Sequence, residues 1–282
     1  MSLLYMCVVI FSVMQSATTK LFTKHSDNSY VFNALKAFFA LILMLLINAN
    51  NMDFDKTTTV YALCYGTLLC ASMYCGYKAL HLGPLSLTSL ISAFSVIVPI
   101  LYGIMCFGEA ITTYKIMGIC FLMLALILIN IKKTNQSGNK PNVKWAIFIF
   151  LTFMGNGLCS VIQTKHQRIF PGEHTSEFMI IAMLLCAVVY LTIALTRFSL
   201  KDFWKTKGKR YGILSGVSNV LANYITLKLA GLENASIMFP IISAGTVFAT
   251  VICGTVLFKE HLKFNHIIAI ICGISAIVFL KL

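Results

Sequence analysis

Charged residues are scarce in this chain of 282 residues. They make up 11% of it, against about 25% in soluble domains, and only nine are acidic. The hydrophobic fraction is 59%, against roughly 45 to 50% in soluble domains. Most of the molecular surface must therefore face lipid instead of water. A chain of this length holds about ten spans of roughly 22 residues, which leaves no room for a soluble domain of even about 50 residues.

The cysteines lack the spacing of a metal site. All ten lie within apolar runs, none forms a C-x-x-C pair, and no histidine stands at metal-site spacing from them. Cysteine in such runs is a small packing residue. We therefore predict no metal and no cofactor.

A dense basic tract is also missing, although the formal net charge is +13. Lysines and arginines instead separate the apolar runs. This excludes nucleic acid as a partner. The first apolar run has no basic leader and no clear small-residue cleavage site, so we expect an uncleaved first span.

The motifs of membrane-embedded enzymes are absent. There is no H-E-x-x-H, no pair of aspartates inside an apolar run, and no Ser and His converging within one. The six histidines lie at the ends of the runs. We predict that the protein is not an enzyme, and a membrane-embedded enzyme, a channel or a non-transporting membrane protein stays open as the alternative.

Ten apolar runs remain, each near the roughly 20 residues that a helix needs to cross about 30 Å of hydrocarbon. They predict an all-α integral membrane protein of about ten transmembrane helices. The runs cover residues 3–22, 30–49, 58–80, 85–107, 111–131, 144–164, 177–196, 211–230, 235–258 and 264–281.

The most polar connection falls near the middle of the chain and divides it into two halves of five runs. Short motifs recur about 150 residues apart, as in Phe107-Gly108-Glu109 and Phe258-Lys259-Glu260. We predict a first repeat at 1–131, a polar linker at 132–143 and a second repeat at 144–282. Because five is odd, the second repeat must insert upside down, and such inverted repeats are typical of alternating-access transporters.

Several motifs resemble the EamA-like group of the drug/metabolite transporter superfamily. In the first half they are Ala79-Leu80, the run GPLSLTSL at 83–90, Pro99, Gly108-Glu109 and Gly118. In the second half the pattern runs from Ala235-Ser236 through Phe258-Lys259-Glu260. It departs from the first half in two places, because Pro240 comes earlier than Pro99 and Ala269 stands where a glycine would match Gly118. The resemblance covers both halves. It implies ten helices in two inverted repeats around a cavity lined chiefly by spans 1, 3, 4, 6, 8 and 9. It implies no particular substrate.

Polar side chains inside the apolar runs are the candidates for a substrate path, because they cost free energy in lipid and should face a cavity or another helix. The alternative is that they join helices by hydrogen bonds. The candidates are Gln15, Ser16, Tyr65, Ser72, Tyr74, Tyr77, Asn156, Gln163, Ser215, Ser218, Asn219, Asn223 and Tyr224.

Lys36 is a further path candidate, about six residues or 9 Å into the second run. A cation at that depth could attract an anionic substrate or neutralise carbonyl ends. Alternatively, it extends its stem to the interface, or packs on Phe32 or Phe39.

Four residues are structural or gating candidates. Lys78 and Lys228 end the third and eighth runs, where a cation complements the helix dipole. Glu109 and Glu260 precede the next helix, where a carboxylate can cap exposed amides. No carboxylate lies near the middle of any run, so proton coupling through a buried acid has no visible carrier.

Two arguments on orientation disagree. The loops after runs 1, 3, 5, 7 and 9 carry fifteen lysines and arginines, and the other side carries six. The positive-inside rule then places both termini outside the cytoplasm, whereas the family resemblance favours both inside.

The prediction for function is an exporter, importer or exchanger of a small organic metabolite or drug-like solute, acting by alternating access. We expect it to be a multi-pass protein of the cell membrane whose partners are the bilayer and the solute.

Overall fold

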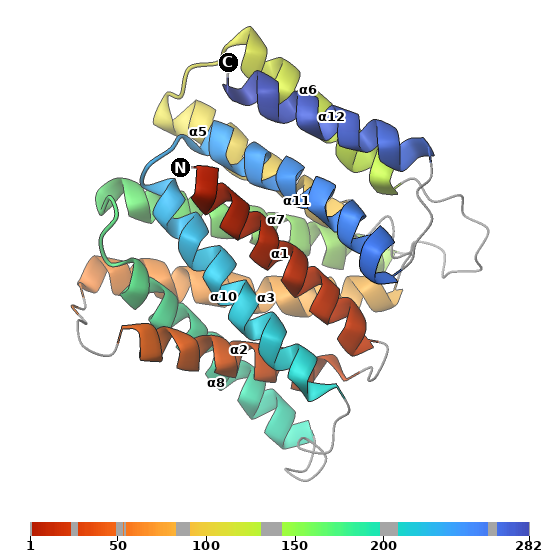
Figure 1. The fold of residues 1–282 in the computed structure, drawn as a ribbon. Coiled ribbons are helices and arrows are strands. Elements are labelled where there is room, and N and C mark those ends of the chain that lie inside the picture. Colours follow the sequence, from red (N-terminus) through yellow and green to blue (C-terminus); the bar gives the residue numbers. More distant parts are fainter. Residues whose placement is uncertain are drawn as a thin grey trace. The chain divides into compact units, whose positions relative to one another are not determined.

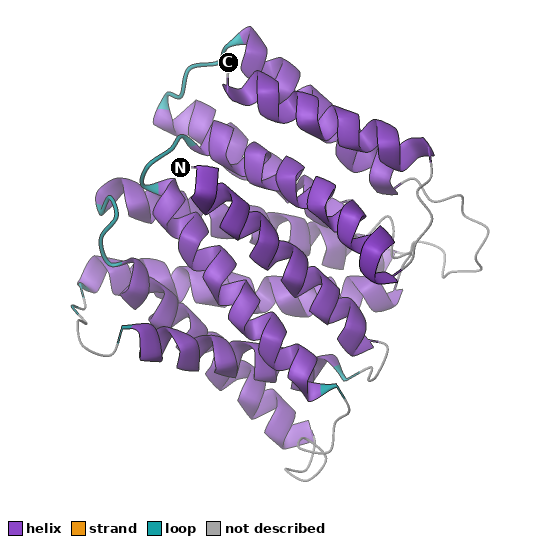
Figure 2. Cartoon of the chain, viewed as in Figure 1, coloured by secondary structure: helices purple, strands orange, loops and turns teal. Residues whose placement is uncertain are grey.

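The computed structural model describes residues 2–23, 28–48, 53, 55–82, 91–130, 143–197, 208–258 and 264–281. These residues form ten α-helices and one short 3-10 turn, and no strand occurs among them (Figures 1 and 2). The all-α prediction is confirmed.

The helices follow the predicted runs. Their bounds are α1 Ser2–Thr23, α2 Ser29–Ile47, α3 Lys56–Leu82, η1 Phe94–Val96, α5 Ile97–Phe107, α6 Thr113–Asn130, α7 Val143–Ile169, α8 Thr175–Arg197, α10 Lys209–Ala230, α11 Ala235–Phe258 and α12 Phe264–Lys281. Five of them, α1, α2, α3, α7 and α8, are long and apolar enough to cross a membrane by length and composition.

The fourth predicted run, 85–107, is interrupted by η1, so that α5 begins only at Ile97. A second departure from the predicted bounds is at the end of α7. We predicted an end near residue 164 because Lys165, His166 and Arg168 follow, yet the helix continues to Ile169. Lys165 and Arg168 are exposed, whereas His166 is fully buried. The added turn is therefore amphipathic, and a fall in hydropathy alone does not mark the end of a helix.

The chain forms two compact units that do not coincide with the two predicted repeats. The first contains residues 1–70 and 165–232, and the second contains residues 71–164 and 233–282. Each unit therefore combines segments of both halves of the sequence, and α3 and α7 each contribute to both units.

In the first unit, α10 packs between α1 and α2, and α2 packs along α8 (Figure 1). Helices α2 and α8 are antiparallel, because contacts join their opposite ends. Ser176 donates to Asn48 Oδ1 at 2.8 Å, and the Arg197 guanidinium lies 5.0 Å from the Tyr30 ring centre.

Two glycines of α10 permit its close approach to α2. A Cβ on Gly212 would lie 3.3 Å from the Cβ of Leu35, and one on Gly216 would lie 3.0 Å from the Cα of Lys36 and collide with its carbonyl oxygen. The G-x-x-x-G of this helix therefore lets two helices within one chain approach closely.

In the second unit, α6 packs along α12, and α11 packs against α5, α6 and α12. Gly118 of α6 has a similar role to the glycines of α10, since a Cβ there would lie 2.6 Å from Leu280 Cγ. Ala79, Trp145 and Ile149 form a buried cluster in the same unit.

Replacing Gly216 with Ala should destabilise the protein by about 1 to 3 kcal/mol, because the added methyl meets the backbone of α2 and not a side chain that can rotate away. Thermal unfolding of the purified protein in detergent measures this. Gly273→Ala is the matched control, since its Cβ would lie 3.7 Å from the carbonyl oxygen of Ala244, an ordinary contact. Equal unfolding temperatures for the two variants would contradict the close α2–α10 contact.

Candidate functional site

A chain of hydrogen bonds joins three helices of the first unit. Asn219 of α10 donates from Nδ2 to Gln15 Oε1 of α1 at 3.2 Å. One turn further along α10, Asn223 donates from Nδ2 to the Asn219 carbonyl at 2.9 Å, and Tyr65 of α3 donates from its hydroxyl to Asn223 Oδ1 at 3.1 Å. We call Gln15, Asn219, Asn223 and Tyr65 the amide chain.

The sequence explains why these residues meet. Asn219 and Asn223 are four residues apart and therefore lie one above the other on one face of α10. Tyr65 is 1% exposed, with its ring 5.2 Å from that of Phe178, so its hydroxyl is presented from a fixed position. The two asparagines and Gln15 are only partly buried, so the amide chain retains accessible polar surface.

The other predicted path residues of the first unit are not part of the amide chain. Ser16 is exposed and donates to the carbonyl of Ser12 in its own helix, so it makes no contact with the amide chain. Ser215 and Ser218 are fully buried, and neither hydroxyl has a hydrogen-bond partner among the described residues. Lys36 is 9% exposed.

A second polar contact, in the second unit, joins α3 to α7. The Ser72 hydroxyl donates to Asn156 Oδ1 and lies 3.4 Å from the Thr152 carbonyl oxygen. Gly155 permits this approach, since a Cβ there would lie 2.9 Å from the Cβ of Ser72. Gln163 of α7 is also buried, at 3% exposure.

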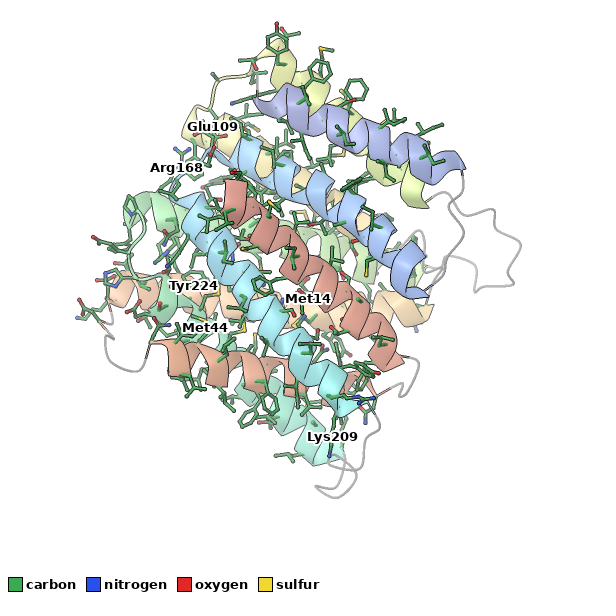
Figure 3. The ribbon with its side chains drawn as sticks, viewed as in Figure 1. Met14, Met44, Glu109, Arg168, Lys209 and Tyr224 are labelled. Atoms are coloured by element: carbon green, nitrogen blue, oxygen red, sulfur yellow. The ribbon has the colours of Figure 1, made fainter. Side chains whose placement is uncertain are left out.

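The lysines near the C-terminal ends of α3 and α10 share one local arrangement. Lys78 Nζ lies 5.8 Å from the ring centre of Tyr74, and Lys228 Nζ lies 4.6 Å from the ring centre of Tyr224 (labelled in Figure 3). In both cases the tyrosine precedes the lysine by four residues, and the two pairs are 150 residues apart in the sequence. The side chain of Tyr77 and the whole of Glu260 lie outside the described residues.

Glu109 caps a helix, but not the one predicted. The sequence suggested α6, which follows it, whereas its carboxylate accepts from the backbone N–H groups of Ala235 and Ser236 at 3.0 and 2.9 Å (Figure 3). These are the first two residues of α11. Two free N–H groups and the positive end of the helix dipole both favour a carboxylate there.

The two glycines near Glu109 make this cap possible. Gly108 ends α5 with a φ of +63°, a conformation that glycine adopts without steric cost and that turns the chain. A Cβ on Gly103 would lie 2.9 Å from Glu109 Oε2, so glycine leaves room for the carboxylate. The Gly-Glu motif thus places one buried charge at a helix terminus.

Lys115 completes the cap and was not among the residues predicted from the sequence. It is 9% exposed, and its ammonium donates to the Ala110 carbonyl at 2.8 Å and to Ser236 Oγ at 3.2 Å. An opposite charge therefore lies beside the residue that Glu109 binds. Lys115 lies in the first turn of α6, where a lysine at the membrane interface is common, so nothing in the sequence marked it as a residue that binds α11.

A buried polar cluster in the first unit was also not predicted from the sequence. The ring of His166 lies between Thr58 Oγ1, at 3.0 Å from its Nε2, and Gln167 Nε2, at 3.1 Å from its Nδ1. Gln167 Oε1 accepts from Gly172 N–H at 3.0 Å, which fixes the amide with its NH2 group facing His166 and the Glu173 carbonyl. Nδ1 must therefore accept, and the proton of a neutral ring lies on Nε2.

The same cluster orders the beginning of α3. The N–H of Thr58 donates to Asp55 Oδ2 at 3.0 Å, and this hydrogen bond lowers the pKa of the Asp55 carboxyl. The spacing of Gln163, His166 and Gln167, at three and four residues, could have revealed an inward-facing polar stripe.

Among the described residues, no group of three or more acidic, histidine or cysteine side chains could hold a metal ion.

Residues 1–131 match the model of the EamA-like transporter family. This match confirms the resemblance drawn from the motifs of the first half of the chain. Together with the five helices that are long and apolar enough to cross a membrane, it supports a multi-pass integral membrane protein.

The chain is similar along nearly its whole length to two other proteins. It is 22% identical over 279 residues to an uncharacterised protein of Haemophilus influenzae, covering 95% of this chain and 94% of that one. A protein of known crystal structure superposes with a TM-score of 0.76 at 12% identity, covering 98% of this chain and 94% of the other. At this identity the second likeness concerns the fold alone.

Replacing Glu109 with Gln should lower the stability by about 1 kcal/mol, because the charge and one of two acceptor oxygens for the α11 amides are lost. Thermal unfolding measures the change, with Glu233→Gln as a control that removes a carboxylate two residues before α11. An unchanged unfolding temperature with altered flux in vesicles would instead favour a gating role for Glu109.

Proposed function

Because residues 1–131 match the EamA-like transporter family, we propose that the protein carries a small organic solute across the cell membrane by alternating access. The amide chain is the observation that carries the proposal. It joins α1 and α3 of the first predicted repeat to α10 of the second. Inverted repeats can open a site to either side of the membrane when they rock against each other, and the solute must then bind residues from both.

The chemistry of the amide chain suits a polar organic solute. Carboxamides offer both donors and acceptors, and a phenolic hydroxyl adds one of each. Groups that are hydrogen-bonded to one another can exchange those partners for a solute at little net cost. Such a site explains why polar groups are retained in helices that otherwise face lipid.

The two tyrosine–lysine pairs support the division into repeats. Tyr74 and Lys78 have the same spacing and interaction as Tyr224 and Lys228, at an offset of 150 residues. A conserved local geometry at corresponding positions is what a duplicated five-helix unit would leave. We propose that both pairs position the ends of α3 and α10 at the membrane interface, where a lysine complements the helix dipole.

An unbiased metabolite comparison of cells and medium, with and without the protein, identifies the solutes, and uptake of those solutes into proteoliposomes then tests transport directly. Asn223→Ala should lower the flux about tenfold or more, because it removes a donor and an acceptor from the amide chain. Tyr65→Phe, which removes one hydroxyl, should have a smaller effect.

The matched control is Thr67→Val on the same helix as Tyr65. Thr67 is exposed and its hydroxyl donates to the Cys64 carbonyl of its own helix, so flux should stay within about twofold of the wild type. Purified wild-type protein that moved none of the enriched solutes faster than empty vesicles would refute the proposed transport. Equal losses in all three variants would refute the role of the amide chain.

A further inference from the structure

Lys36 lies on the buried face of α2. The stripe at four-residue spacing consists of Phe32, Lys36, Ala40 and Met44, which are exposed by 7, 9, 0 and 0%. Phe38, on another face of the helix, is 38% exposed. A lysine that extends its stem along lipid to the interface would start from the exposed face. Lys36 instead begins among the helices of the first unit.

Its neighbours do not balance its charge. Gly216 of α10 contacts its backbone, and Cys186 of α8 is the group with which it interacts electrostatically. Among the described residues, Lys36 has no hydrogen bond to a carboxylate or carbonyl and no ion pair. A thiol is ordinarily protonated at neutral pH and carries no charge.

The described carboxylates of this unit near α2 lie far from Lys36. Glu177 and Asp53 meet where α8 begins, and Glu177 follows Ser176, which is bonded to Asn48 at the end of α2. Asn48 is twelve residues from Lys36, or about 18 Å along the helix. Charges at that distance do not replace a hydrogen-bonded partner.

We infer that Lys36 is the counter-charge for a monovalent organic anion, a carboxylate; this inference rests on the transport function proposed above. A buried cation without a partner is among the costliest groups in a membrane, and an anionic solute would neutralise it. One ammonium balances one negative charge. A doubly charged phosphate would leave a net charge in a medium of low dielectric constant.

The inference has two signatures that a structural lysine would not show together. Lys36→Met should raise the unfolding temperature in the absence of solute, because it removes a buried charge and keeps the apolar stem. The same variant should lose at least about tenfold of the flux of anionic solutes in proteoliposomes. Lys36→Arg, which keeps the charge, should retain part of that flux.

Competition with simple probes tests the charge directly. Uptake of the solutes found in the cell comparison is measured in phosphatidylcholine vesicles, which carry no net charge, in the presence of benzoate, benzamide or phenyl phosphate. Benzoate should inhibit the wild type at concentrations about tenfold lower than benzamide, and Lys36→Met should abolish the difference. Phenyl phosphate as the strongest inhibitor would overturn the monovalent assignment.

Two controls separate the alternatives. Lys165→Met removes a charge from an exposed position of the same unit and should leave the preference for benzoate unchanged. Cys186→Ala should also leave it unchanged, and if it reproduced the Lys36→Met effect, an internal ion pair with the thiol would replace the inference.

The outcomes also separate this inference from the proposed function. Transport of neutral or cationic solutes by the wild type, or a flux unaffected by Lys36→Met, would overturn the role of Lys36 while transport stands. An absence of any transported solute would overturn both.

Discussion

Hydrogen bonds between helices organise this protein, because the hydrocarbon core of a membrane offers no water to polar side chains. Each amide or hydroxyl within an apolar helix must find a partner on its own helix, on another helix or on a ligand. Most threonine hydroxyls donate to a backbone carbonyl of their own helix, as Thr18 does. The amide chain joins α1, α10 and α3, and Glu109 links the end of α5 to α11. The few groups that find no partner are then the most informative about function.

The compact units show how the same constraint acts on the chain as a whole. Neither unit is a sequence half, since segments from both halves pack together in each. Glycines mark the closest of these contacts, at Gly216 against α2 and at Gly118 against Leu280. In a membrane, where apolar surface is already solvated by lipid, such close van der Waals contact stabilises association more than hydrophobicity does.

Composition and spacing were sufficient to predict the ten helices, because a span of the membrane requires a long apolar run and little else. They also selected polar residues that meet in the structure, such as Asn219 with Gln15 and Ser72 with Asn156. They failed where the partner lies far away in sequence. The target of Glu109 is 126 residues further on, and the pairing of Lys115 with Ser236 spans 121. His166 was missed because a polar side chain near the end of an apolar run is ambiguous until the rest of the fold shows which way it faces.

The cap on α11 has a consequence for how the protein is made. The first two amides of α11 need the carboxylate of Glu109, which the ribosome has synthesised 126 residues earlier. Until α11 emerges, Glu109 is a charged side chain at the end of α5 without its eventual partner. The cap can form only after both halves of the chain have been synthesised, so the two halves do not complete their folding independently.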